Sequence, residues 1–463
     1  MELSLANIVE RWDVYEIALD VDDSRAGNPF SDIQLSAQFE HPLHTAEAEG
    51  FYDGNGKYRI RYMPGQEGVW KYRTSSNRME LDGLIGEFIC TQASPDNHGP
   101  IKVRDNTHFQ YADGTPYTPI GTSCYGWHLQ SEQMQKLTLR SLQKSPFNKV
   151  RISVTPTADL LNVSYFSRLE QRVQDLAALD IQAELILFYS EDEGTEGIDK
   201  LSPEEEERYL RYVIARFAAY RNIWWSFVNE QDRSPDKKQQ DWDRLARMIM
   251  EYDYGVHLRT ILSPPMGYDF GAPWITHMSI KHTDVRIASE YTKHYAKPII
   301  IEECGCEGNL DTRFGSLTPE ELMCRIWEGH LRGGYVTHGE TYLRNDGLLW
   351  HWHGGELQGQ SIQRIEFMRG ILEDAPHQMA YSSDRLDAAT LEVRGEYYLQ
   401  YFGPHRFAYR EFALPEGKYQ AEIIDTWNMT ITPLTELMEG RFRIDLPGKL
   451  YYALRIRKVS GGS

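Results

Sequence analysis

The spacing of hydrophobic and polar positions changes twice along the chain. In residues 1–95, stretches such as "KYRIRYMP" and "GVWKYRTSS" alternate apolar and polar side chains, and Gly/Asp turns such as "YDGNGKY" separate them. A period of two with tight turns is typical of antiparallel strands. We therefore expect a small β-sandwich over residues 1–95, followed by a Pro/Gly/Asn linker, "SPDNHGP".

Residues 96–378 alternate strand-like and helix-like segments. Apolar runs such as "NKVRISV", "AELILF" and "PIIIEE" are each followed by amphipathic stretches such as "SRLEQRVQDLAALD". Ser202 can cap one helix with Pro203 at its first position, and another helix is predicted to begin at Thr318. Roughly eight such units predict a (β/α)8 TIM barrel. The alternative, a doubly wound sheet, needs a glycine-rich phosphate turn, which "GTSCYGWHLQ" is not.

The period returns to two near the C-terminus, in "LEVRGEYYLQYFG", "RFRIDLPG" and "YYALRIRKV". This pattern predicts a second antiparallel β-sandwich over residues 379–460. The expected fold class is therefore α/β, a barrel over residues 96–378 flanked by N-terminal and C-terminal β-sandwich domains.

Charge and composition exclude several kinds of partner. The chain has 463 residues, with 49 Lys and Arg against 68 Asp and Glu, a net charge of −19. Such an acidic chain is a poor match for nucleic acid or an anionic membrane, both of which need basic patches. The 11 Trp and 28 Tyr residues either fill cores or stack on sugar rings. Two flanking β-domains and an aromatic-rich surface are also compatible with a homo-oligomer.

The first residues and the cysteines predict a cytoplasmic protein. "MELSLANIVERWDVYEI" has no basic segment followed by an apolar run, so we expect neither a signal peptide nor a membrane span. Five cysteines, an odd number, indicate reduced thiols. Cys304 and Cys306 lack a second pair for zinc, and His351 and His353 lack a third ligand. We therefore expect no metal and no cofactor.

Carboxylates at the ends of two predicted strands indicate hydrolytic chemistry. Asn229 and Glu230 end the fourth strand of the barrel, and Glu302 and Glu303 end the seventh. Catalytic residues of such barrels lie where strands end. A pair of carboxylates about 5–5.5 Å apart can cleave a glycosidic bond with retention. Asn229 could bind the neighbouring sugar hydroxyl.

A cation on the second strand fits this chemistry. Arg151 in "NKVRISV" would keep a nearby nucleophilic carboxylate ionised. The alternative for Arg151 is an ion pair that only supports the fold. The strand pattern itself leaves the choice between Glu302 and Glu303 open. Successive side chains of a strand point to opposite faces, and a parallel barrel strand is apolar on both.

Other polar and aromatic residues near predicted strand ends are candidates for sugar binding. A lone histidine at such a position is more often a hydrogen-bonded structural group, but several together with tryptophans predict a polar pocket with an aromatic wall. The candidates are Trp127, His128, Tyr189, Asp192, His282, Glu307, His338, Glu340 and Trp350.

Several motifs together resemble one family. "AELILFYSEDEG", "RYVIARFAAYRNIWWSFVNEQD", "PWITHMSIKH", "KPIIIEECGCEG" and "GHLRGGYVTHGE" are similar to the apiosidase-like glycoside hydrolases, and both flanking regions resemble the β-domains of that family. The resemblance implies that Glu230 is the acid/base and Glu303 the nucleophile. It leaves Glu302 behind the site and Glu307 at the rim. Family members read Asp-Glu-Pro where this chain has Glu302-Glu303-Cys304, which bears on the substrate.

The resemblance implies a retaining hydrolase of a small β-linked glycoside, with a pentose or furanoside at the −1 subsite. The expected partner is therefore a small glycoside or oligosaccharide. Three alternatives remain: a hydrolase of the same clan acting on a hexoside, an inactive carbohydrate-binding barrel, and a metal-dependent lyase or esterase. The last lacks both a metal cluster and a GxSxG elbow in the sequence.

Overall fold

A computed structural model describes most of the chain, and the chain forms two compact units. The described residues are 7–21, 27–154, 160–189, 201–228, 238–255, 257–263, 269–385 and 387–459. Unit 1 comprises Met1–Arg104, Phe109–Tyr117 and Arg151–Thr276. Unit 2 comprises Asp105–His108, Thr118–Val150 and His277–Ser463.

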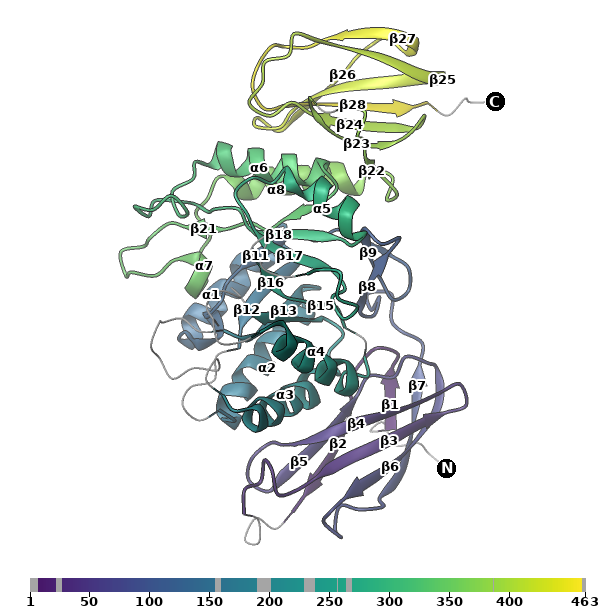
Figure 1. The fold of residues 1–463 in the computed structure, drawn as a ribbon, viewed down its shortest axis with the longest axis vertical. Coiled ribbons are helices and arrows are strands. Elements are labelled where there is room, and N and C mark those ends of the chain that lie inside the picture. The colour runs from purple at the N-terminus through teal and green to yellow at the C-terminus, as the bar shows by residue number, and fades with distance from the viewer. Residues whose placement is uncertain are drawn as a thin grey trace. The chain divides into compact units, whose positions relative to one another are not determined.

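Unit 1 begins with a mainly antiparallel β-domain, drawn in purple and blue in Figure 1. Its strands pair in the order β1-β7-β6-β3-β4-β5-β2, with β1 parallel to β7. Apolar side chains such as Phe39 and Trp70 are fully buried, and Phe39 stacks on Tyr62 at 4.3 Å. The strands are β1 (Ile8–Glu10), β2 (Tyr15–Asp20), β3 (Leu35–His41), β4 (His44–Tyr52), β5 (Lys57–Tyr62), β6 (Gly68–Ser76) and β7 (Ile85–Thr91).

A small three-stranded sheet follows, in the order β10-β9-β8. Its strands are β8 (Ile101–Arg104), β9 (His108–Tyr111) and β10 (Pro116–Tyr117).

The rest of unit 1 is a parallel sheet with helices. Neighbouring strands pair in the order β12-β13-β14-β15, and every side chain of β13 and β14 is buried. Burial on both faces explains their continuous apolar runs. Helices α3 and α4 pack side by side (Figure 1). The elements are β12 (Lys149–Ser153, of which Lys149 and Val150 belong to unit 2), α2 (Val163–Ala177), β13 (Gln182–Phe188), α3 (Pro203–Phe217), β14 (Ile223–Val228), α4 (Gln239–Tyr252), β15 (Arg259–Thr260) and β16 (Leu262–Ser263).

Unit 2 contains a second parallel sheet in the order β17-β18-β20. An irregularity after Ile280 brings Lys281 opposite Glu303 in the pairing of β17 with β18. The elements are β11 (Gly121–Ser123), η3 (Trp127–Leu129), α1 (Glu132–Gln143), β17 (Met278–Lys281), α5 (Ile287–Tyr295), β18 (Ile299–Glu303), β19 (Glu307–Gly308), α6 (Pro319–Leu331), β20 (Tyr335–Val336), β21 (Glu340–Thr341), α7 (Trp350–His353) and α8 (Ser361–Glu373).

The C-terminal β-domain, yellow in Figure 1, belongs to unit 2. Its strands pair in the order β22-β23-β24-β28-β25-β26, with β27 on β25. Trp327 of α6 stacks on Tyr401 of β24 at 5.5 Å. The strands are β22 (Ala380–Tyr381), β23 (Ala389–Val393), β24 (Tyr397–Tyr401), β25 (Tyr409–Asp425), β26 (Thr430–Pro433), β27 (Met438–Asp445) and β28 (Tyr452–Lys458).

The predicted periods match the observed elements closely. "GVWKYRTSS" is strand β6, and the apolar run of "PIIIEE" is strand β18. The predicted cap at Ser202 is confirmed, because its side chain accepts from Glu205 N while Glu205 reaches back to the Ser202 backbone. The Thr318 cap is confirmed by its acceptance from Glu321 N at 3.2 Å. The boundaries at residues 95 and 378 stay predictions.

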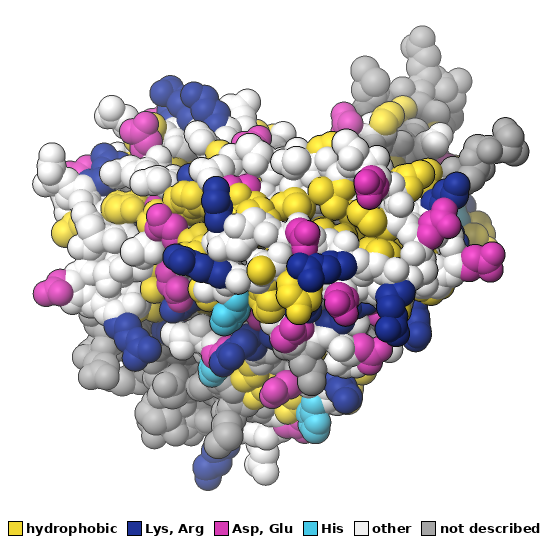
Figure 2. All heavy atoms as spheres, turned by 90° about the horizontal axis from the view of Figure 1, so that it is seen from above, with side chains coloured by type: hydrophobic (Ala, Val, Ile, Leu, Met, Phe, Trp, Pro, Cys, Tyr) yellow, Lys and Arg dark blue, Asp and Glu magenta, His cyan; other side chains and the backbone are white. Residues whose placement is uncertain are grey.

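The surface carries charges of both signs. On the face shown in Figure 2, the described Lys and Arg side chains lie among Asp and Glu side chains rather than in a patch of their own. No described helix is long and apolar enough to cross a lipid bilayer.

Candidate active site

Glu303 ends strand β18 with its carboxylate held by two side-chain donors. The hydroxyl of Tyr125 donates to Oε1 at 2.6 Å, and Nζ of Lys281 lies 3.0 Å from Oε2. Nε2 of His351 lies 3.9 Å from Oε1. Hydrogen bonds and a cation at this distance favour the ionised form of a carboxylate. We call Glu303, Tyr125, Lys281 and His351 the Glu303 corner.

The fold brings these side chains together from distant segments. Tyr125 follows β11, and the rings of His351 and Trp352 in α7 lie 4.9 and 5.2 Å from its ring. The backbone N–H of Tyr125 also donates to the carbonyl of His351 at 3.1 Å. The Lys281 side chain is 40% exposed, whereas that of Glu303 is 4% exposed. The corner is therefore preorganised and reaches solvent on the lysine side.

Glu302 lies in a separate, buried network. Nζ of Lys149 lies 2.7 Å from its Oε1, and both side chains are fully buried. The hydroxyl of Thr337 donates to Oε2 at 2.6 Å. The two neighbouring glutamates thus meet different partners, as alternation along a strand requires. Both oxygens of Glu302 are engaged inside the protein.

Glu307, expected at the rim, is fully buried in the structure. Its carboxylate accepts from the backbone N–H groups of Gln360 and Ser361, at 2.7 and 3.1 Å. The hydroxyls of Tyr342 and Ser361 also donate to it. These bonds satisfy donors at the start of α8, which has no side-chain cap of its own. The geometry is that of a structural anchor.

Glu340 is buried in a similar way. Its two oxygens accept from the N–H groups of Gln358 and Gly359, both at 2.8 Å. Burial raises the pKa of Glu340 to about 7, and the nearby Glu307 carboxylate adds to this rise against the lowering effect of the two N–H groups. The carboxylate of Glu340 therefore faces backbone N–H groups, whereas a residue that binds sugar is expected to face the solvent.

His338 and Trp350 come together on the hydroxyl of Thr122. Nε1 of Trp350 donates to Thr122 Oγ1 at 2.9 Å, and Nδ1 of His338 lies 3.1 Å from the same oxygen. Burial lowers the pKa of His338 to about 3, so its ring is neutral near pH 7. Both side chains are buried.

Trp127 and His128 lie in η3 with fully buried side chains. The carbonyl of His128 accepts from Nε2 of Gln135 at 3.1 Å, which ties η3 to α1.

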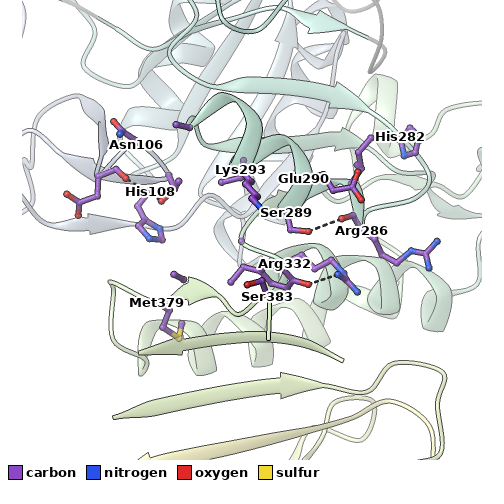
Figure 3. A pocket seen from close by; sticks show the side chains of 18 of the residues that line it. Asn106, His108, His282, Arg286, Ser289, Glu290, Lys293, Arg332, Met379 and Ser383 are labelled. Carbon is purple, nitrogen blue, oxygen red and sulfur yellow. Dashed lines mark hydrogen bonds between the residues drawn. The ribbon is translucent and has the colours of Figure 1, made fainter. Parts of the chain in front are cut away.

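His282 is partly buried, and its backbone N–H donates to the carbonyl of Glu303 at 3.0 Å. It lines a pocket of about 970 Å³ along α5, with charged side chains from several segments around it (Figure 3). Arg286 in this pocket pairs with Asp284, and Arg332 donates to the hydroxyl of Tyr381 at 2.9 Å.

Two candidates of unit 1 are described. Nε of Arg151 lies 3.0 Å from Oε1 of Glu184, and both side chains are fully buried. Tyr189 is buried after β13. Asn229, Glu230 and Asp192 lie outside the described residues.

Comparison with family models identifies the family of this chain. The apiosidase-like catalytic domain matches residues 125–391. The chain belongs to the apiosidase-like family. Two domains of unknown function, DUF5060 and DUF5605, match residues 8–77 and 386–457 on either side. Among curated proteins, none matches the chain significantly.

Solved structures agree with this family. A structure from Bacteroides vulgatus ATCC 8482, provisionally described as a glycoside hydrolase, has 35% identity and a TM-score of 0.92, covering 98% of this chain and 100% of that one. A glycoside hydrolase family 5 structure from the same organism has 13% identity and a TM-score of 0.64, covering 79% and 95%. The second likeness shows the fold alone. This apiosidase-like chain is a glycoside hydrolase, with an α/β domain flanked by β-domains.

Sequence reasoning missed two lysines of the apiosidase-like domain. Lys149 sits inside the otherwise apolar strand β12, and Lys281 ends β17. A buried lysine needs a partner, so Lys149 within "NKVRISV" was a signal for a buried carboxylate. Among the described residues, no group of three His, Cys, Asp or Glu side chains could hold a metal ion.

Proposed function

We propose that this hydrolase works with retention, with Glu303 as the nucleophile and Glu230 as the acid/base on a closed (β/α)8 barrel. The parallel orders β12-β13-β14-β15 and β17-β18-β20, with helices between successive strands, support the barrel. The Glu303 corner is the observation that carries the assignment.

The partners of Glu303 suit a nucleophile. An attacking carboxylate must be ionised, and the Tyr125 hydroxyl and Lys281 ammonium both stabilise the charge. Glu302 is a poorer candidate because its side chain and that of its partner Lys149 are both fully buried. The Lys281 side chain beside Glu303, by contrast, is 40% exposed. The chemical environment therefore favours the same residue as the family register.

The proposed reaction has two displacements. In the first, a Glu303 oxygen bonds to the anomeric carbon, the glycosidic C–O bond breaks, and Glu230 gives its proton to the leaving oxygen. In the second, Glu230 takes a proton from water, and the resulting oxygen attacks the same carbon. The bond to Glu303 breaks, which restores both carboxyl groups and leaves the sugar with its original anomeric configuration.

The proposed substrate is a small β-linked glycoside with a pentose or furanoside at the −1 subsite. The apiosidase-like family match supports this class. The rings of His351, Trp352 and Phe314 gather near Tyr125 and Lys281 and could wall the sugar. Asn229 is proposed to bind the hydroxyl beside the reacting carbon. Roles in sugar binding for Arg151, Tyr189, Asp192 and His282 stay predictions.

The test is hydrolysis of p-nitrophenyl α- and β-glycosides of pentoses and hexoses, with proton NMR of the first sugar anomer released. We expect activity on a β-pentoside or β-furanoside and a product of the same configuration. A 2-fluoro glycoside of the accepted sugar should label the peptide that contains Glu303.

Each of the following outcomes would contradict one part of the proposed function. An inverted product would overturn the double displacement, and a label on another residue would overturn Glu303. Hydrolysis of hexosides alone would overturn the sugar assignment. No hydrolysis of any glycoside by the folded protein would favour a carbohydrate-binding role.

A further inference from the structure

Two buried glutamates hold four consecutive backbone N–H groups. The carboxylates of Glu307 and Glu340 together accept from the N–H groups of residues 358–361. Glu307 and Glu340 are register partners in the parallel pair β19 and β21, so their side chains emerge side by side. We call these two glutamates and residues 358–361 the carboxylate clamp.

The clamp lies at the start of a helix that has no side-chain cap. α8 begins at Ser361, and its N-cap residue Gln360 makes no side-chain cap. The first N–H groups of a helix need an acceptor, and a carboxylate is a strong one. Burying two neighbouring carboxyl groups is costly: burial raises the pKa of Glu340 to about 7, and the nearby Glu307 carboxylate adds to this rise. Capping one helix does not by itself explain why two carboxyl groups are buried against this short segment.

One side of the clamp leads to Glu303. Glu307 follows Glu303 by four residues, through a link with Gly305 at φ 106°. A Cβ on Gly305 would lie 2.8 Å from Leu317, so the link is tightly enclosed. Sγ of Cys306 in this link lies 3.9 Å from Nδ1 of His351. The link therefore joins the clamp to the Glu303 corner in sequence and in space.

The other side of the clamp leads to His351. The segment between β21 and α8 carries α7, and its far end is the clamped stretch 358–361. Before that stretch, Gly355 is tied to α1 by Thr138 Oγ1, which accepts from Gly355 N at 2.8 Å. Glu307 of the clamp thus lies in the link that follows Glu303, and residues 358–361 of the clamp end the segment that carries His351.

We propose that Glu307 and Glu340 are positioning residues, which fix the segment carrying His351 against the link carrying Glu303. They act through these neighbours and do not touch the sugar. The proposal rests on the proposed function, because it gives Glu303 the central role.

Gly359 allows the clamp to be opened without changing a charge. A Cβ on Gly359 would lie 2.7 Å from Oε2 of both Glu307 and Glu340, so Gly359→Ala must displace the carboxylates. We expect kcat to fall about 10- to 100-fold with KM changed less than about threefold, since misplacement by about 1 Å costs rate on this scale. The matched control is Gly370→Ala in α8, where an added Cβ meets nothing within 4 Å.

Glu340→Gln tests the same point through its acceptor. The amide leaves one N–H group of the clamp without an acceptor, so we expect the same direction of change in kcat. Glu356→Gln is the control, because Glu356 lies in the same segment and is exposed. Circular dichroism and thermal unfolding establish that each variant is folded.

A double-mutant cycle separates positioning from general loss of structure. If the clamp acts through His351, Gly359→Ala should cost little further activity in a His351→Gln background. Fully additive losses, or Gly359→Ala and Glu340→Gln with wild-type kcat, would overturn the clamp proposal. Glu303→Gln with full activity would overturn the proposed function instead, so the two failures are distinguishable.

Discussion

Two neighbouring regions of unit 2 both gather buried glutamates, but they satisfy them with different donors. At the end of β18, the glutamates meet side chains: Lys149 for Glu302, and Tyr125 and Lys281 for Glu303. At β19 and β21, Glu307 and Glu340 meet mainly backbone N–H groups.

The difference separates carboxylates that can react from carboxylates that hold the fold. Backbone donors lie in a segment of fixed path, so two glutamates that together accept from four of them organise the chain. A side-chain hydroxyl and a partly exposed ammonium can stabilise charge while leaving room for a ligand. Burial alone does not distinguish the regions, because Glu303 and Glu340 are both buried.

The largest expected effect is on catalysis by Glu303. Glu303→Gln should lower kcat by about three to five powers of ten, because it removes the nucleophile. Thermal unfolding should stay close to wild type, and hydrolysis of the best p-nitrophenyl glycoside gives the rate. Glu302→Gln should keep more activity. The reverse ranking of the two variants would mean that the functional roles along β18 are exchanged.

Next in size is the buried ion pair behind Glu303. Lys149→Met leaves Glu302 buried without its cation and should lower the free energy of unfolding by about 3–5 kcal/mol. The control is Lys136→Met, because Lys136 pairs with Glu132 at side-chain exposures of 62% and 79%. Such a surface pair contributes about 0–1 kcal/mol. Urea unfolding followed by tryptophan fluorescence measures both, and equal effects would contradict the burial argument.

The carboxylate clamp should make stability depend on pH. The pKa of Glu340 is about 7 in the folded protein against 4.5 for an ordinary glutamate. The folded state therefore binds more protons than the unfolded state between these values, and the free energy of unfolding falls as pH rises through this window. The contribution is up to about 3 kcal/mol.

Glu340→Gln should remove that part of the slope between about pH 4.5 and 7. The titratable groups around Glu340 (Glu307, Tyr342, Cys124 and Cys306) are unchanged in the variant. Urea unfolding at several pH values gives the slope. An identical slope in both proteins would show that Glu340 is not the group responsible.

A smaller effect is expected at the hydroxyl of Tyr125. Tyr125→Phe removes a 2.6 Å hydrogen bond to Glu303 but keeps the ring contacts with His351 and Trp352. A hydrogen bond to a charged group is worth about 1.5–3 kcal/mol, so kcat should fall about 10- to 100-fold. Wild-type kcat in a folded variant would place Tyr125 outside the reaction.

The smallest effect concerns Lys281. Its side chain is 40% exposed, so solvent and salt screen its charge on Glu303. Lys281→Gln should shift the acidic limb of the pH profile of kcat/KM to higher pH by less than about one pH unit. The reason is that a nearby cation favours the ionised form of a carboxylate, and the variant lacks it. Lys281→Arg should retain the wild-type limb. A limb that moves to lower pH would contradict the pairing.

Local pattern predicted most of the elements of this protein. The period of two in "GVWKYRTSS" and the apolar run before Glu302 are visible in the chain, because burial of one or both strand faces acts on adjacent residues. The caps at Ser202 and Thr318 were also visible, since each involves residues only three apart. The same patterns placed Glu303 at the end of a strand.

Only the tertiary structure decided what each glutamate meets. Lys149 lies 153 positions before Glu302, and Tyr125 lies 178 before Glu303, so no local period could pair them. Likewise, Glu307 appeared to be a rim residue until the approach of Ser361, 54 positions later, gave its carboxylate backbone donors. The sequence by itself determined which segments become strands and where acids end them. The packing of distant segments determined which acid is anchored and which has side-chain donors and solvent nearby, because burial and hydrogen-bond partners arise only when those segments meet.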